Sequence, residues 1–117
     1  MSNYQDLKVW KKSRTLVAEV YKATRVFPRS EIYGLTSQMR RAALSIAANI
    51  AEGHGRWTRR DCRSFLLIAR GSAHELETEL LIAEDLEFLS GEHSGTLRCA
   101  TNEIGRMLSG LIRYYSA

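Results

Sequence analysis

Apolar residues recur every three or four positions along most of this 117-residue chain, which is the spacing of amphipathic helices. The pattern predicts four helices, at about residues 7–26, 35–52, 58–88 and 94–115. No stretch alternates as a half-buried strand would, so we expect an all-α fold. Because short connections favour antiparallel neighbours, the chain is predicted to be one domain, residues 1–117, built as an up-down-up-down four-helix bundle.

Local signals set the predicted ends of these helices. Pro28 ends the first helix, because proline lacks an amide donor and restricts the residue before it. Gly53 is placed to follow the last residue of the second helix, and Thr58 is placed to cap the third. The run SGEHSG at residues 90–95 has the composition of a loop, so we expect the fourth helix to begin near Ser94.

The third helix carries more apolar surface than one core can cover. Residues 65–69 read FLLIA, which is apolar around one and a half helical turns. The second helix is also apolar over most of its circumference, which is typical of a helix that is central or buried in an interface. We therefore expect a second partner surface, and the simplest one is another copy of the chain in a homo-oligomer.

Charge is distributed unevenly along the chain, whose formal net charge is +4. Residues 1–63 hold 13 Lys and Arg against five Asp and Glu, whereas residues 64–117 hold four against eight. Such asymmetry indicates either a polyanionic partner or oppositely charged surfaces that meet each other.

The densest positive charge lies in GHGRWTRRDCR, residues 53–63, at a predicted turn and helix start. Cations are disfavoured at a helix N-terminus, so helix stability does not explain these arginines. Helix N-terminal amides and arginine side chains both bind phosphate, and tryptophan can stack on an unpaired base. The candidate nucleic-acid-binding residues are Arg56, Trp57, Arg59, Arg60 and Arg63, helped by Lys8, Lys11 and Lys12. The alternative is a solvated turn with the indole of Trp57 folded back onto the end of the bundle.

A second group of charges is expected to be structural. Two arginines lie within the apolar second helix, where a charge needs a partner. Folding the second and third helices about a turn near residue 55 brings these arginines within about one helical turn of several acids. We expect an ion-pair network, inside the bundle or across a subunit boundary, formed by Arg40, Arg41, Glu75, Glu77 and Glu79. Nucleic-acid contact by the two arginines is the alternative.

The sequence carries no pattern that indicates catalysis, a metal or a cofactor. His54, His74 and His93 are scattered without metal-ligand spacing, and no phosphate-binding loop is present. Cys62 and Cys99 belong to no motif and fit reduced thiols. No apolar run is long enough to span a membrane, and the N-terminus lacks a signal-peptide pattern. We therefore expect a cytoplasmic protein that is not an enzyme and takes no cofactor.

Two long blocks of the sequence resemble a known family. YGLTSQMRRAALSIAANIAEG at residues 33–53 and FLLIARGSAHELETELLIA at 65–83, with LKVW at 7–10 and FP at 27–28, are similar to the bacterial 23S rRNA-intervening sequence protein family, whose members are also called S23-type ribosomal proteins. The resemblance covers nearly the whole chain and implies a four-helix bundle that assembles into a ring, with a pentamer favoured. In a distantly similar group, accessory proteins of retroelement reverse transcriptases, a basic pentamer binds nucleic acid and the enzyme.

The residues and the resemblance together predict a non-enzymatic, oligomeric four-helix-bundle protein that binds RNA or another nucleic acid through a basic surface. The alternative is a protein-interaction scaffold or an accessory subunit, for example of a retroelement reverse transcriptase, that does not itself contact nucleic acid.

Overall fold

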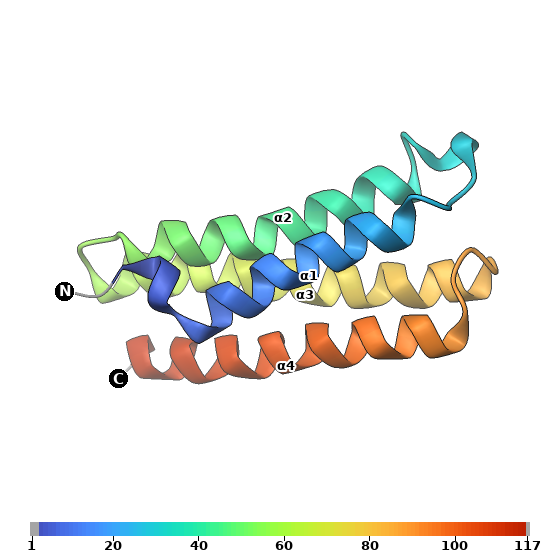
Figure 1. The fold of residues 1–117 in the computed structure, drawn as a ribbon. Coiled ribbons are helices and arrows are strands. Elements are labelled where there is room, and N and C mark those ends of the chain that lie inside the picture. The colour runs from blue at the N-terminus through green and yellow to red at the C-terminus, as the bar shows by residue number, and fades with distance from the viewer. Residues whose placement is uncertain (1–2, 117) are drawn as a thin grey trace.

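The structure is a computed structural model and describes residues 3–116. Four helices account for most of these residues (Figure 1). Their bounds are Lys8–Thr24 (α1), Leu35–His54 (α2), Arg59–Asp85 (α3) and Gly91–Ser116 (α4). Two short 3-10 helices, Tyr4–Asp6 (η1) and Arg29–Glu31 (η2), precede α1 and α2. The predicted all-α fold with four helices is confirmed.

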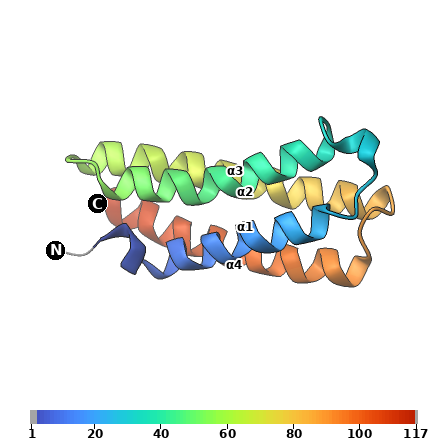
Figure 2. The ribbon, with the colours of Figure 1, turned by 45° about the horizontal axis from the view of Figure 1, so that its top comes forward.

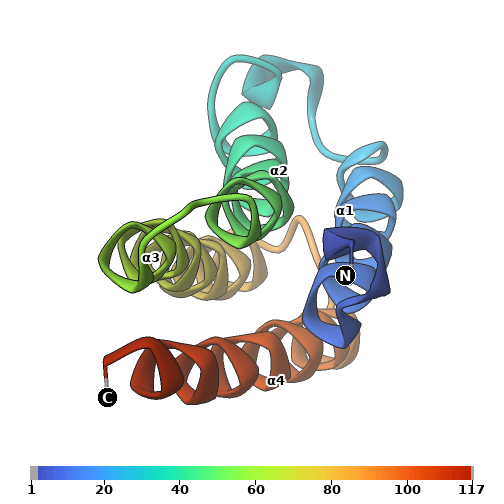
Figure 3. The same cartoon turned by 90° about the vertical axis from the view of Figure 1, so that its left-hand side faces the viewer.

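Consecutive helices run in opposite directions and pack side by side (Figures 1 and 2). α1 packs on α2, α2 on α3 and α3 on α4, and α4 closes the bundle against α1. Seen along its length, the bundle is a quadrilateral in which α1 lies diagonally opposite α3 (Figure 3). One end of the bundle therefore holds the start of α1, the α2–α3 connection and the end of α4, and the other end holds the remaining two connections (Figure 1).

The core is built from one face of each helix, as the apolar spacing predicts. Met39, Ile46 and Ile50 of α2 are fully buried, and so are Leu76 and Leu80 of α3. Burial of each such side chain stabilises the fold by about 1.5–3 kcal/mol. Buried hydroxyls donate to carbonyl oxygens one turn earlier in their own helix and so keep hydrogen-bond partners; they belong to Ser13, Thr24 and Thr101.

α2 and α3 approach each other closely beside the connection between them. Gly53 is buried there, and a Cβ at this position would lie 3.0 Å from Phe65 Cβ and 3.1 Å from the Cys62 carbonyl oxygen. α2 continues past this glycine to His54, and Gly55 is its C-cap. The prediction that Gly53 follows the helix is therefore wrong, because close packing of two helices, rather than helix termination, requires the glycine.

The register of α2 against α3 is fixed by Ser45 and Ser72, whose hydroxyl oxygens are 2.8 Å apart. Because the two helices are antiparallel, Arg40 lies level with about residue 77 of α3. The register predicted from a turn near residue 55 is wrong, because the connection extends to Thr58 and the helices pair about a point beyond it.

α3 ends at Asp85, three residues before its predicted end. The amide of Phe88 donates to the Ala83 carbonyl and the amide of Glu87 donates to the Glu84 carbonyl, which is the pattern of a Schellman motif. Glu87 has a φ of 62°, in the left-handed region that glycine usually supplies. With glutamate at this position, the composition carried no signal for the end of the helix.

α4 begins at Gly91, so the loop predicted for residues 90–95 is wrong. The Ser90 hydroxyl accepts a hydrogen bond from the His93 amide at 3.0 Å, which is the bond made by an N-capping serine. Serine and glycine in this run therefore start a helix instead of interrupting one.

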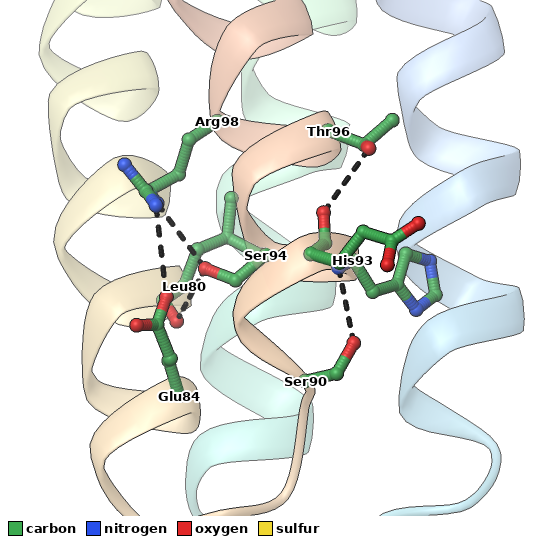
Figure 4. Close-up of polar contacts among 8 residues, drawn as sticks. Leu80, Glu84, Ser90, His93, Ser94, Thr96 and Arg98 are labelled. Carbon is green, nitrogen blue, oxygen red and sulfur yellow. Dashed lines mark hydrogen bonds and ion pairs between the residues drawn. The ribbon is translucent and has the colours of Figure 1, made fainter.

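The first turn of α4 is also tied to α3 (Figure 4). The buried Ser94 hydroxyl donates to the Leu80 carbonyl at 3.3 Å and accepts from Arg98 Nε at 3.2 Å. The guanidinium of Arg98 lies 3.6 Å from a carboxylate oxygen of Glu84. These tertiary bonds stabilise a helix start that its composition alone disfavours.

The close approach of α2 and α3 predicts a large difference between two glycine substitutions. Gly53→Ala should lower the free energy of unfolding by about 1–3 kcal/mol, because the added methyl group meets backbone at contact distance. Gly71→Ala is the matched control: it lies on the exposed side of α3 with no atom within 4 Å of the added Cβ, and should raise stability by up to about 1 kcal/mol. Urea unfolding followed by circular dichroism measures both. Equal effects would show that the contact at Gly53 does not restrict this position.

Candidate nucleic-acid interface

Four of the predicted arginines and Trp57 gather at the α2–α3 connection. We call this group of residues the basic corner: Arg56, Trp57, Arg59, Arg60 and Arg63. The Thr58 hydroxyl accepts a hydrogen bond from the Asp61 amide at 3.1 Å, which confirms it as the N-cap of α3. The connection is short, and the Trp57 side chain is 100% exposed. The indole therefore does not fold back onto the end of the bundle, and the solvated turn with a packed tryptophan is not what forms.

Two arginines of the basic corner are held by contacts within the chain. Arg56 pairs with Glu52 at 2.7 Å, and its guanidinium lies 4.5 Å from the centre of the Phe65 ring. Arg59 donates a hydrogen bond to the Tyr114 carbonyl and lies over the rings of Tyr114 and Tyr115, at 4.6 and 5.4 Å from their centres. Arg59 thus connects the start of α3 to the end of α4.

The other two arginines differ in exposure. Arg60 is exposed and Arg63 is half-buried. Neither takes part in the ion pairs formed within residues 3–116. Together with the exposed indole of Trp57, they form the part of the basic corner that is best suited to contact a ligand.

The predicted lysines lie in the first turns of α1, at the same end of the bundle as the basic corner but on the diagonally opposite helix (Figure 3). Lys8, Lys11 and Lys12 line a groove of about 550 Å³ between α1 and α4. Lys12 pairs with Glu103 across this groove at 3.0 Å. The structure therefore brings the lysines and the arginines to one end of the protein, but to two different faces.

Arg40 and Arg41 point to different neighbours. Arg40 Nε donates to the Thr24 hydroxyl at 2.9 Å, and the guanidinium lies over the Tyr21 ring at 4.6 Å. Arg41 is exposed and lines a shallow groove between α2 and α3, beside Glu75. The contact of Arg40 with α1 could not be predicted from charge pairing, because a hydroxyl and a ring hold this arginine instead of a carboxylate.

The acids of the predicted network are not paired with these arginines inside the chain. None of the ion pairs among residues 3–116 includes a member of the predicted network, which is Arg40, Arg41, Glu75, Glu77 and Glu79. Glu79 is buried, and its Oε1 has no hydrogen-bond partner. Burial raises the pKa of Glu79 from 4.5 to about 7, with smaller contributions from the charge of Glu75 and a hydrogen bond to it. The network across a subunit boundary stays a prediction.

Metal clusters and membrane-spanning helices are absent from the part of the chain that the structure describes. Residues 3–116 contain no cluster of three or more His, Cys, Asp and Glu side chains that could hold a metal ion. Within the same residues, no helix combines the length and apolar character needed to cross a bilayer. Cys62 is buried and Cys99 is exposed, and both are free thiols.

The fold and the site define an all-α four-helix bundle whose basic corner contains a fully exposed tryptophan, Trp57. Residues 5–110 match the family described as 23S rRNA-intervening sequence protein, and the chain belongs to this family. The crystal structure of a protein of unknown function from the S23 ribosomal protein family of Bacteroides thetaiotaomicron VPI-5482 is similar, with a TM-score of 0.81 and 26% sequence identity. The similarity covers 89% of this chain and 97% of that one. None of the curated proteins matches the chain.

The contacts of Arg59 predict that it stabilises the fold, unlike its neighbour. Arg59→Ala should lower the free energy of unfolding by about 1–2 kcal/mol, through loss of a charged hydrogen bond and of cation–π contact. Arg60→Ala, at an exposed position, should change it by less than about 0.5 kcal/mol. Urea unfolding of the two variants at equal protein concentration measures the difference. If both variants unfold like the wild type, Arg59 does not hold α3 to α4.

Proposed function

We propose that the protein is a non-enzymatic, oligomeric bundle of the bacterial cytoplasm that binds RNA or another nucleic acid through the basic corner. The observation that carries the proposal is the full exposure of Trp57 among arginines at the start of a helix. An indole in water gains by stacking on any unpaired base, and stacking of this kind contributes about 1–3 kcal/mol per base. The family name, which refers to sequences that intervene in 23S rRNA, agrees with an RNA ligand.

The phosphate contacts are assigned to Arg60 and Arg63, with Arg56 and Arg59 adding positive field from fixed positions. Arginine matches phosphate with two parallel hydrogen bonds, and the dipole of α3 favours an anion at its N-terminus. Lys8, Lys11 and Lys12 would extend the contact around the same end of the bundle. The cationic surface makes binding sensitive to salt, because each neutralised phosphate releases counterions.

Fluorescence anisotropy with a labelled single-stranded RNA, and with an RNA hairpin and DNA of the same sequence, tests the proposal at about 50 and about 200 mM salt. Trp57→Ala should weaken binding to the single strand by about tenfold or more through loss of stacking. Replacing Arg60 and Arg63 by alanine should weaken binding and lower the salt dependence, by a slope of about 0.7 for each phosphate that is no longer neutralised.

Two controls separate stacking and local charge from general effects. Trp57→Phe keeps an aromatic face and should retain most of the affinity. Arg29→Ala removes an exposed cation at the opposite end of the bundle and should leave binding nearly unchanged. Absence of binding to all three nucleic acids at low salt would reject the proposal.

Self-association is the second part of the proposal. Large apolar side chains lie on the outer surfaces of α2 and α3, where the bundle itself does not cover them: Leu44, Leu67, Ile68, Leu81 and Ile82, each 41–51% exposed. Monomeric proteins seldom expose a contiguous apolar surface of large size. The resemblance favours a ring of five copies, in which the basic corners would be repeated around one rim.

Analytical ultracentrifugation tests self-association directly. The wild-type chain should sediment as an oligomer at micromolar concentration, and Ile68→Glu should shift it towards the monomer, because the charge would be buried in the contact. Asn102→Glu, which changes an exposed residue of α4 on the side that faces α3, is the control and should leave the mass unchanged. A monomeric wild-type chain would contradict this part of the proposal.

The alternative function is a scaffold or accessory subunit that binds another protein. The exposed side chains of Ile82 and Leu86, beside the acids of α3, favour it, since exposed apolar residues rimmed by charge are typical of protein contacts. A protein retained by the purified chain after nuclease treatment, together with absent nucleic-acid binding, would favour the scaffold over the RNA-binding protein.

A further inference from the structure

Two carboxyl groups on α3, those of Glu75 and Glu79, form no ion pair within residues 3–116. Glu79 is only 9% exposed and its Oε1 has no hydrogen-bond partner, while Glu75, one turn earlier on the same side of the helix, is exposed. Glu75 lines the shallow groove between α2 and α3, of about 320 Å³, whose other walls are Gln38, Arg41, Ala42, Ser45 and Ser72. A buried carboxylate without a cationic partner is strongly unfavourable, so this place is suited to a cation from outside the chain.

The outer side of α1 carries the complementary charge. Exposed residues follow one another at intervals of three and four along it and include four cations and no acid: Lys8, Lys11, Thr15, Ala18, Lys22 and Arg25. Within residues 3–116, the ion pair that Lys22 forms is a loose surface pair with Glu19, at 3.8 Å, and such pairs contribute little. Small residues in the middle of the row allow another helix to approach closely.

Hydrogen bonds between neighbouring helices define which residues lie at the same height along the bundle. Arg40 bonds to Thr24 and so sets α2 against α1, and the Ser45–Ser72 pair sets α2 against α3. Counting along the antiparallel helices from these two contacts places Lys22 of α1 level with Glu75 of α3. Counting through α4, from the Lys12–Glu103 and Ser94–Leu80 contacts, places it level with Leu81, so Glu79 lies within the interval that the two counts define.

By the count through α2, Arg25 is level with residue 78, beside Glu79. α1 and α3 run in the same direction (Figures 1 and 2) but lie on a diagonal of the bundle (Figure 3), so these charges do not meet within one chain.

We propose that, in the assembled protein, α1 of a second copy lies along the α2–α3 groove and places Lys22 and Arg25 on the Glu75–Glu79 carboxyl pair. The inference rests on the self-association proposed above and identifies its contact. In a cyclic assembly whose symmetry axis is parallel to the bundle, rotation of one copy onto the next does not change the position of a residue along that axis. Residues of two copies can therefore meet only if they lie at about the same height along the bundle. The contact is heterologous, since the cations of one copy meet the acids of the next.

Apolar side chains at the same height agree with this placement. Val26 is 80% exposed and is level with about residue 79, so it would contact Ile82 of the neighbouring copy, which is 42% exposed. Lys8, at the other end of α1, is level with residue 61 of α3 and thus with the basic corner. The nucleic-acid surface proposed above would therefore remain at one end of the assembly.

Protonation of Glu79 gives the contact a pH dependence. In the single chain the pKa of Glu79 is raised to about 7, first by burial and then by the charge of Glu75 and a hydrogen bond to it. Glu75, one turn earlier on the same helix, is the charged group that acts on Glu79, and Arg41 of α2 lines the groove with Glu75. A cation from a second copy lowers this pKa, so association releases a proton and strengthens as pH rises. Below about pH 7, association should weaken by about tenfold per pH unit for one proton.

Sedimentation velocity of the full chain at about pH 6 and about pH 8 tests the titration. The wild-type dissociation constant should be about tenfold higher at the lower pH, and Glu79→Gln should abolish the difference. His74→Gln is the matched control: it replaces an exposed imidazole that lines a groove between α3 and α4, and it should leave the pH dependence unchanged.

Charge reversal at exposed positions tests the pairing without disturbing the core. Lys22→Glu and Glu75→Lys should each weaken association by tenfold or more, and the double variant K22E/E75K should recover most of the loss. Glu92→Lys, an exposed reversal at the start of α4, should have little effect.

The outcomes distinguish this contact from self-association in general. A wild-type chain that is monomeric at both pH values overturns both. An oligomer that is unaffected by Lys22→Glu and Glu75→Lys overturns only this contact, and so does weaker association in both single variants without recovery in the double variant.

Discussion

The close approach of α2 and α3 is the constraint on which the rest of the structure depends. Gly53 lets the two backbones meet beside the connection, and the hydroxyls of Ser45 and Ser72 keep them together further along. With the helices this close, α3 begins soon after α2 ends, and the connection between them is too short to fold over Trp57. Glu79 follows Ser72 by two helical turns on α3, which puts it on the side that faces α2, and it is buried there. The exposed indole and the buried acid are thus two consequences of one helix pair.

Much of the fold could be predicted from the sequence, because the helices are long and strongly amphipathic and the connections are short. The ends of the helices were harder to predict, for separate physical reasons. Gly53 serves packing between helices, which looks in sequence like a helix stop. Glu87 adopts a backbone conformation normally given to glycine, and Ser90 caps a helix in a run whose composition is typical of a loop. In each case a contact between residues, rather than the preference of one residue, determined the local structure.

The candidate site was predictable in its location but not in its internal contacts. A cluster of arginines next to a turn is visible in any sequence, and helix counting puts it at one end of a bundle. The different roles of the arginines depend on side chains far away in sequence, such as the two tyrosines that hold Arg59. The partner of Arg40 was missed for the same reason: Thr24 and Tyr21 belong to a helix whose register against α2 could not be derived from periodicity alone.

The short loop that holds Trp57 has a consequence for the energetics of any complex. The backbone on either side is held by the Thr58 helix cap and by the hydrogen bond from the Arg56 amide to the Gly53 carbonyl, so the ring has little freedom to find shelter in the unbound state. A large aromatic surface therefore stays hydrated until a ligand arrives, and little backbone entropy is left to lose when it does. Release of that water, with few accompanying losses of motion, would let a small contact area give a useful affinity.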